Sequence, residues 1–207
     1  MLQTVILAAG ASTRTYPLTL TRPKPLLKVM NKPILAHLLD QFSECGVEEA
    51  IIVVGYKQQM IRDYFGNEYN GMKLKFVEQK EQLGTLHALH QVKDLLNDRF
   101  FVHYGDDLVH ADDLKKCLKH RYAMCLMETK NPERFGIAKI ENGKVVTIIE
   151  KPKEYIGNYA SIGGFMFDMK IFDYPLEKDS GEKEFYIPNM IRKLANDEDI
   201  IPIIIEK

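Results

Sequence analysis

The chain has 207 residues, of which 45% are hydrophobic and 28% charged, which suits one folded domain and excludes a disordered chain. Its formal net charge of −1 argues against a general nucleic-acid binder or membrane-surface protein, and no apolar run approaches the roughly 20 residues of a transmembrane helix. No secretory signal precedes the first apolar stretch, and the three cysteines form no CxxC pair. We therefore expect a cytoplasmic protein with reduced thiols.

Apolar runs of strand length alternate with helical periodicity through the first 120 residues. The pattern predicts strands at 4–7, 50–54, 73–77 and 100–104. It predicts helices from Pro33 to about Gly46, at 58–65, at 85–96 and at 112–120, the last capped by Asp112. Such alternation is typical of a three-layer α/β/α sandwich, so we expect a Rossmann-like, mixed but mostly parallel sheet.

After residue 122, strand-like runs dominate. They lie at 123–128, 136–140, 145–150, 161–167 and 200–205, with one further helix at 185–194. Asn142-Gly143 separates two of the runs and is a strong signal for a tight hairpin turn. We expect these strands to extend the sheet and to add a small inserted hairpin, so that residues 1–207 form a single domain.

The first candidate for chemistry is the segment that follows the first strand, residues 7–26. Its small residues let the backbone approach a phosphate closely, and Arg14 and Lys24 supply positive charge for triphosphate oxygens. Residues 1–32 contain five basic side chains and no acidic one, which suits a small polyanionic ligand. The alternative is a tight turn followed by an ordinary basic surface loop, because the segment is neither a GxGxxG fingerprint nor a P-loop.

Two further candidates also lie at strand ends. Asp106, in the sequence YGDD, offers a carboxylate that suits Mg²⁺, although a turn or cap aspartate is the simpler interpretation of one such residue. Two adjacent aspartates favour a bound cation, because like charges side by side are costly. In Glu150-Lys151-Pro152, the lysine could bind a second phosphate and the glutamate could accept hydrogen bonds from sugar hydroxyls. The alternative is an ordinary charged segment at the end of a strand.

Taken in order, these segments resemble the nucleotidyltransferase family that makes nucleotide sugars, such as glucose-1-phosphate thymidylyl- and uridylyltransferases. The family pattern LAAGxGTRLxPLTxxxPKPLLPV is followed closely by residues 7–29. Gln79 with Leu83-Gly84-Thr85 resembles its base-reading segment, YGDD its metal-binding strand end and Phe135-Gly136 its sugar contact. EKP resembles its phosphate-gripping step, and SIGGFMF at 161–167 its NAGIYIF-like strand.

The resemblance implies a role for each matching position. Those implied to hold the nucleotide are Leu7, Ala8, Ala9, Gly10, Gln79, Gly84 and Thr85. Arg14 and Lys24 are implied to act on the triphosphate, and Asp106 to bind Mg²⁺ as the cofactor. The sugar phosphate is implied to contact Gly136, Glu150, Lys151 and Ser161.

The sequence departs from the family pattern at three places. Ser12 replaces the second loop glycine, as in some relatives that use cytidine nucleotides, and Ser161 stands where many members have asparagine. The family's Trp-x-Asp-x-Gly element, which supplies a second metal ligand after the last strand, has no counterpart up to Lys207.

The expected reaction is in-line attack of an acceptor phosphate oxygen on the α-phosphorus of a nucleoside triphosphate, with release of pyrophosphate. A phosphomonoester is mostly dianionic at pH 7, so no protein nucleophile or general base is required. The expected partners are thus a nucleoside triphosphate and a phosphorylated small molecule, with a sugar 1-phosphate as the first candidate. No nucleic-acid or membrane partner is expected, and a homo-oligomer is left open.

Other functions are compatible with parts of this pattern. A cytidylyltransferase acting on phosphocholine or inositol phosphate would need the same basic loop. A regulatory protein that binds nucleotide without turnover would not need the second metal ligand. A metal-dependent glycosyltransferase would place carboxylates at a strand end but would not need Arg14 and Lys24.

Overall fold

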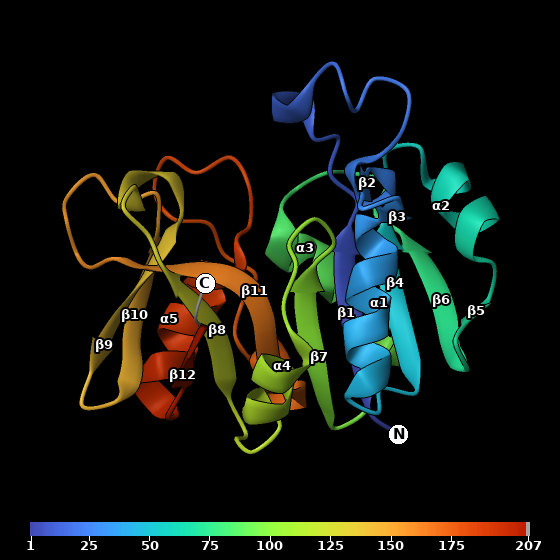
Figure 1. The fold of residues 1–207 in the computed structure, drawn as a ribbon. Coiled ribbons are helices and arrows are strands. Elements are labelled where there is room, and N and C mark those ends of the chain that lie inside the picture. The colour runs from blue at the N-terminus through green and yellow to red at the C-terminus, as the bar shows by residue number, and fades with distance from the viewer. Residues whose placement is uncertain (206–207) are drawn as a thin grey trace.

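The computed structural model describes residues 1–205 except for the side chain of Arg14. A ten-stranded sheet runs through the molecule, and its main path follows the order β10-β9-β11-β7-β1-β4-β6-β5 (Figure 1). A small separate hairpin, which the sequence did not predict, pairs β2 (Lys28–Val29) with β3 (Lys32–Pro33).

The centre of the sheet is parallel, as the alternation of strands and helices predicted. It consists of β1 (Gln3–Ala8), β4 (Glu49–Val54), β6 (Met72–Glu78) and β7 (Arg99–Tyr104). β1 pairs in parallel with both β4 and β7, and β4 pairs in parallel with β6. The short β5 (Glu68–Tyr69) closes this side by antiparallel pairing with β6. The carboxyl ends of four parallel strands therefore meet at one edge of the sheet.

The later strands extend the same sheet, as expected, but chiefly in antiparallel pairs. β11 (Tyr159–Asp168) lies antiparallel to β7 and also pairs with β8 (Ala123–Glu128) and β9 (Gly136–Glu141). β12 (Ile201–Ile205) runs parallel to β8. The predicted hairpin joins β9 to β10 (Lys144–Glu150), and its turn residues Asn142 and Gly143 have φ of 50° and 75°, as a type I′ turn requires.

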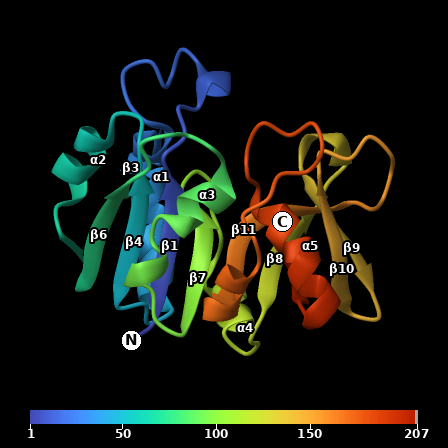
Figure 2. The ribbon, with the colours of Figure 1, turned by 180° about the vertical axis from the view of Figure 1, so that it is seen from behind.

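Helices cover both faces of the sheet, which confirms the three-layer arrangement. α1 (Ile34–Glu44), α2 (Gln58–Phe65) and α4 (Ala111–Cys117) lie on the face toward the viewer in Figure 1. α3 (Thr85–His90) and α5 (Ile187–Asp197) lie on the opposite face, seen in Figure 2. Successive strand residues serve the two faces in turn, so Val5 belongs to one buried cluster and Ile6 to the other.

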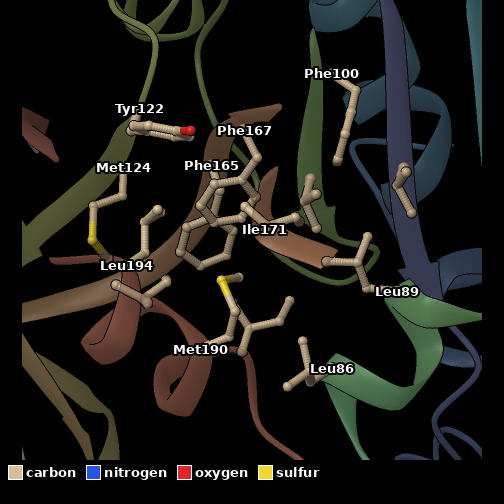
Figure 3. Packing of buried hydrophobic residues seen from close by; sticks show 14 of the residues in the cluster. Leu86, Leu89, Phe100, Tyr122, Met124, Phe165, Phe167, Ile171, Met190 and Leu194 are labelled. Carbon is tan, nitrogen blue, oxygen red and sulfur yellow. The ribbon is translucent and has the colours of Figure 1, made fainter. Parts of the chain in front are cut away.

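The core beneath α3 and α5 is rich in aromatic rings (Figure 3). Phe165 and Phe167 on β11 stack with ring centroids 5.5 Å apart, and both rings are fully buried. Met190 and Leu194 of α5 cover the same layer. This packing fixes the position of β11 and α5, and hence of the segment that leads into α5.

Three predicted helices have wrong bounds. The helix predicted at 85–96 is α3 followed by a 3-10 turn at Lys93–Leu95, because Val92 leaves helical geometry (φ −113°, ψ 4°) to bury its side chain in the core. His110, not Asp112, is the N-cap of α4, which ends at Cys117 rather than at 120. α5 begins at Ile187, because Phe185 is held by hydrogen bonds with Leu83 and Leu86 at the start of α3, and it ends at Asp197 rather than at 194.

Within the described part of the chain, no helix combines the length and the apolar character needed to cross a bilayer.

Candidate active site

The candidate site is built at the carboxyl edge of the parallel strands. β1 ends at Ala8 and β7 at Tyr104, so the turns that follow these neighbouring strands emerge side by side. The Gly105 N–H donates to the Leu7 carbonyl at 2.9 Å, and a Cβ at position 105 would lie 2.9 Å from the Ala8 Cβ. Small residues are thus required here because the two turns pack against each other, a contact that the sequence alone does not show.

Next along the chain, the loop from Gly10 to Leu27 rises above the sheet and is pinned by its own polar groups (Figure 1). The Ser12 carbonyl accepts hydrogen bonds from the hydroxyls of Thr15 at 2.7 Å and Thr19 at 2.9 Å. Tyr56 donates its hydroxyl to the Thr19 carbonyl at 3.0 Å from beyond β4. These hydrogen bonds fix the position of the loop, which carries several positive charges.

The structure places only one of the two catalytic side chains predicted in this loop. Lys24 reaches the strand-end carboxylate, with its Nζ 2.7 Å from Asp106 Oδ2. Arg14 lies in a 3-10 turn at Thr13–Thr15, and because its side chain lies outside the described part of the structure, its role stays a prediction.

The two adjacent aspartates, Asp106 and Asp107, have different environments. The carboxylate of Asp106 is 38% exposed and paired with Lys24. Burial and, secondly, the charge of Asp106 raise the pKa of Asp107 to about 6, against a lowering influence of Lys24. Asp107 therefore holds its proton more tightly than a free aspartate does, and Asp106 is the partly exposed carboxylate that a cation can reach.

A magnesium ion fits this arrangement when phosphate oxygens complete its coordination. Among residues 1–205, no three His, Cys, Asp or Glu side chains gather closely enough to hold a metal by themselves. Mg²⁺ commonly binds one or two carboxylates and keeps waters or phosphate oxygens as its other ligands. Asp106, which already attracts the ammonium of Lys24, provides such a carboxylate.

The segment predicted to read the base follows β6. Gln79 is 5% exposed and donates from Nε2 to the Gly84 carbonyl at 3.1 Å. Gly84 has φ of 104°, and a Cβ there would lie 2.4 Å from the Phe185 carbonyl oxygen. The Thr85 hydroxyl accepts the backbone N–H of Ile187 at 3.1 Å. Gly84 and Thr85 therefore stabilise the fold through these contacts. Their contact with the nucleotide stays a prediction.

The predicted acceptor-side residues form a second group around the exit of β10. Lys151 pairs with Glu150 at 2.7 Å and donates its backbone N–H to Phe135 at 2.9 Å. A Cβ on Gly136 would lie 3.0 Å from Glu150 Oε2, so this glycine lets the carboxylate approach the strand. Lys151 has φ of 44°, a conformation that costs a non-glycine residue energy and concentrates at functional sites.

Ser161 lies on β11 near this second group. In the pairing of β11 with β9, Ala160 lies opposite Ile137, so Ser161 stands one position further toward Gly136. Its hydroxyl oxygen is buried and has no hydrogen-bond partner among the described residues. A buried hydroxyl without a partner suits contact with a ligand group.

The segment before α5 connects the two groups, and sequence reasoning missed it. Phe185 packs on Gly84, and the Tyr186 ring lies 6.0 Å from the Lys151 ammonium. Pro188 lies 3.6 Å from the Cβ position of Gly136. Nothing in the local sequence marks these residues, because their importance comes from contacts that span 35 to 101 positions of chain.

Comparisons with known proteins show the family of this chain. The family model described as "Nucleotidyl transferase" matches residues 3–202. Over 201 residues the chain is 37% identical to the "Bifunctional protein GlmU" of Methanocaldococcus jannaschii, which covers 95% of this chain and 47% of that protein. Over 179 residues it is 36% identical to the "UTP--glucose-1-phosphate uridylyltransferase AglF" of Haloferax volcanii, covering 83% of this chain and 74% of that protein. The chain thus spans about half the length of the GlmU relative.

Solved structures share the whole fold. A Bacillus anthracis protein provisionally described as a glucose-1-phosphate thymidylyltransferase, in complex with sucrose, superposes with a TM-score of 0.90 at 28% identity, over 100% of this chain and 87% of that one. A UDP-glucose pyrophosphorylase complexed with UDP-glucose superposes with a TM-score of 0.85 at 24% identity, over 98% and 90% of the two chains, which concerns the fold alone.

Proposed function

This chain belongs to the nucleotidyl transferase family, and on that premise we propose that it transfers a nucleotidyl group from a nucleoside triphosphate to a sugar 1-phosphate. The observation that carries the proposal is the contact between Lys24 and Asp106. It joins the basic loop to the strand-end carboxylate, so that triphosphate and metal would meet at one place. The AglF relative, whose name states glucose 1-phosphate and UTP, supports the choice of substrates.

The reaction would proceed by a single displacement. An oxygen of the acceptor's phosphate attacks the α-phosphorus and forms the new P–O bond. The bond from the α-phosphorus to the oxygen that bridges it to the β-phosphorus breaks, and pyrophosphate leaves with that electron pair. Because the attacking phosphate is already largely dianionic, the residues act by positioning and by neutralising charge.

Each residue of the site then has a definite task. Lys24 turns from Asp106 to the β- and γ-phosphate oxygens and stabilises the pyrophosphate as its charge grows. Asp106 would hold Mg²⁺, which when bound supplies positive charge to the triphosphate oxygens. Lys151 would hold the acceptor's phosphate, and Glu150 would accept hydrogen bonds from sugar hydroxyls. Gly10 and its neighbours would offer backbone N–H groups to the triphosphate.

The test is pyrophosphate release with each nucleoside triphosphate against a panel of sugar 1-phosphates, phosphocholine and inositol phosphate, with and without Mg²⁺. Release that needs one nucleotide, a sugar 1-phosphate and Mg²⁺ would support the proposal. Release only with phosphocholine or inositol phosphate would replace the sugar by another acceptor. Tight nucleotide binding without release for any pair would contradict transfer and favour a regulatory role.

A further inference from the structure

Gln79 has both N–H groups of its side-chain amide engaged within the protein. Its Nε2 lies 3.1 Å from the Gly84 carbonyl oxygen and 2.9 Å from Nδ1 of His87. A primary amide has two N–H donors and one carbonyl acceptor. With two partners at hydrogen-bond distance, the nitrogen has no proton left for a ligand, whereas no hydrogen bond is made to Oε1 by the described residues.

The Gly84 carbonyl determines this orientation of the amide. A backbone carbonyl only accepts hydrogen bonds, so the amide nitrogen, and not Oε1, has to face it. His87 Nδ1, close to the same nitrogen, must then accept and carries no proton. The other ring nitrogen, Nε2, holds the proton. The exposed Gln91 amide places its nitrogen 3.2 Å from Nε2 and 3.4 Å from the His87 carbonyl oxygen, so a half-turn that gives up this longer bond offers the ring proton an oxygen acceptor.

The surrounding backbone keeps Gly84 and His87 in place. Leu86, between them, is buried, and its N–H donates to the Phe185 carbonyl at 2.9 Å. The Thr85 hydroxyl binds the Ile187 N–H, which ties the same turn to the start of α5. Both acceptors of the Gln79 amide therefore belong to a turn that two hydrogen bonds anchor to residues 185–187, so the amide is held before any ligand arrives.

We propose that His87 is a positioning residue that sets base specificity by forcing Gln79 to present its carbonyl oxygen to the nucleobase. This inference rests on the proposed function and on the predicted contact between Gln79 and the base. An oxygen acceptor pairs with a base whose ring edge carries an N–H, as in uracil, thymine or guanine. It opposes the unprotonated ring nitrogen that cytosine and adenine carry at the corresponding position.

Cytosine and uracil provide the cleanest comparison, because they have nearly the same size and differ in hydrogen bonding at that edge. A polar group left without a partner against the wrong base is the strongest source of such discrimination. We expect kcat/KM for UTP to exceed that for CTP on the order of 100-fold or more. The equilibrium dissociation constants of the two nucleotides should differ in the same direction.

The decisive variants are His87→Leu and His87→Asn. Leucine removes the acceptor, so one Gln79 N–H becomes free and the amide is able to turn toward cytosine; the UTP-to-CTP ratio should fall about tenfold. Asparagine places an oxygen near the position of Nδ1 and should restore most of the ratio. A purely structural role for His87 would lower activity with both nucleotides equally and leave the ratio unchanged.

The measurement uses the full chain, with kcat/KM for UTP, CTP, dTTP, GTP and ATP and with calorimetric binding of UTP and CTP. Preference of the unaltered protein for CTP or ATP would overturn the inference. So would an unchanged UTP-to-CTP ratio in a folded His87→Leu variant. If no nucleotide supports transfer, the proposed function fails, and the binding ratio in the two variants still decides the role of His87.

Discussion

Lys24 and Asp106, 82 positions apart in the sequence, form an ion pair with 2.7 Å between Nζ and Oδ2. The lysine belongs to the loop after β1, and the aspartate follows β7. The same carboxylate is the predicted metal ligand, so the ammonium stands where a metal cation would compete for it. Nucleotide phosphates would draw the lysine away and bring the metal with them, so we expect the exchange of partners to accompany nucleotide binding.

Replacement of Lys24 by methionine should slow nucleotidyl transfer on the order of 100-fold, because a charge that stabilises the leaving pyrophosphate is lost. The same change should tighten Mn²⁺ binding to the nucleotide-free protein, since the competing ammonium is gone. Steady-state pyrophosphate release measures the first effect, and titration of free Mn²⁺ by electron paramagnetic resonance measures the second.

Lys28→Met is the matched control, because Lys28 is an exposed lysine two residues beyond the 3-10 turn Lys24–Leu26. It should leave Mn²⁺ binding unchanged. Asp106→Asn should abolish the Mn²⁺ binding that Lys24→Met strengthens. If Asp106→Asn leaves the Mn²⁺ affinity unchanged, Asp106 is not the metal ligand. If Asp106→Asn weakens Mn²⁺ binding but Lys24→Met leaves it unchanged, the lysine does not compete with the metal.

Asp107 should make the free energy of unfolding depend on pH. Its pKa is raised from 3.8 to about 6, chiefly by burial, so between these values the folded protein binds the proton more tightly than the unfolded chain. This group's contribution therefore favours the folded state at low pH and is lost as pH rises through about 6. At 1.36 kcal/mol per unit the shift corresponds to at most about 3 kcal/mol.

Asp107→Asn should accordingly stabilise the metal-free protein by about 1 to 2 kcal/mol at pH 7.5, with little difference near pH 4. Urea unfolding of both proteins in the presence of a chelator, at several pH values, measures this difference. A variant that is equally stable or less stable at pH 7.5 would show that the buried carboxyl is not a cost to the fold.

Replacement by alanine should lower the stability of the protein at Gly84 but only its nucleotide binding at Gly10. A Cβ at position 84 would lie 2.4 and 2.7 Å from backbone atoms of Phe185, and φ is 104°, so Gly84→Ala should cost about 2 to 4 kcal/mol of stability. Apart from its two chain neighbours, no atom of the described residues lies within 4 Å of a Cβ at position 10. Gly10→Ala should fold normally and raise KM for the nucleotide, because it obstructs backbone approach to phosphate. Equal stability of the two variants would contradict this.

Thr85 should matter for stability as well as for any ligand contact. Thr85→Val removes the acceptor of the buried Ile187 N–H and should lower the free energy of unfolding by about 1 kcal/mol, whereas Thr85→Ser keeps the hydroxyl and should lose little. The urea midpoint at unchanged slope is the measurement. A valine variant of full stability but weak nucleotide binding would assign the hydroxyl to the ligand alone.

Local sequence signals were sufficient to predict most elements of the fold. The helix at 58–65 and the strand at 123–128 have the predicted bounds, because their periodicity and flanking residues leave little choice. Asn142-Gly143 determined its hairpin because both residues tolerate the positive φ of the turn. The basic loop and the strand-end aspartate could also be predicted, since each is recognisable within a short stretch of chain.

Only the tertiary structure decided which of these segments and side chains contact one another. The position of β11 between β7 and β8, the early end of α3 at His90 and the late start of α5 after Phe185 depend on packing between distant segments. The same holds for the pairing of Lys24 with Asp106, and for the hold of His87 on Gln79. Periodicity and motif chemistry act over a few residues, and therefore the sequence determined which groups are present, whereas side-chain partners and the direction of a hydrogen bond were determined only when the folded chain brought those groups together.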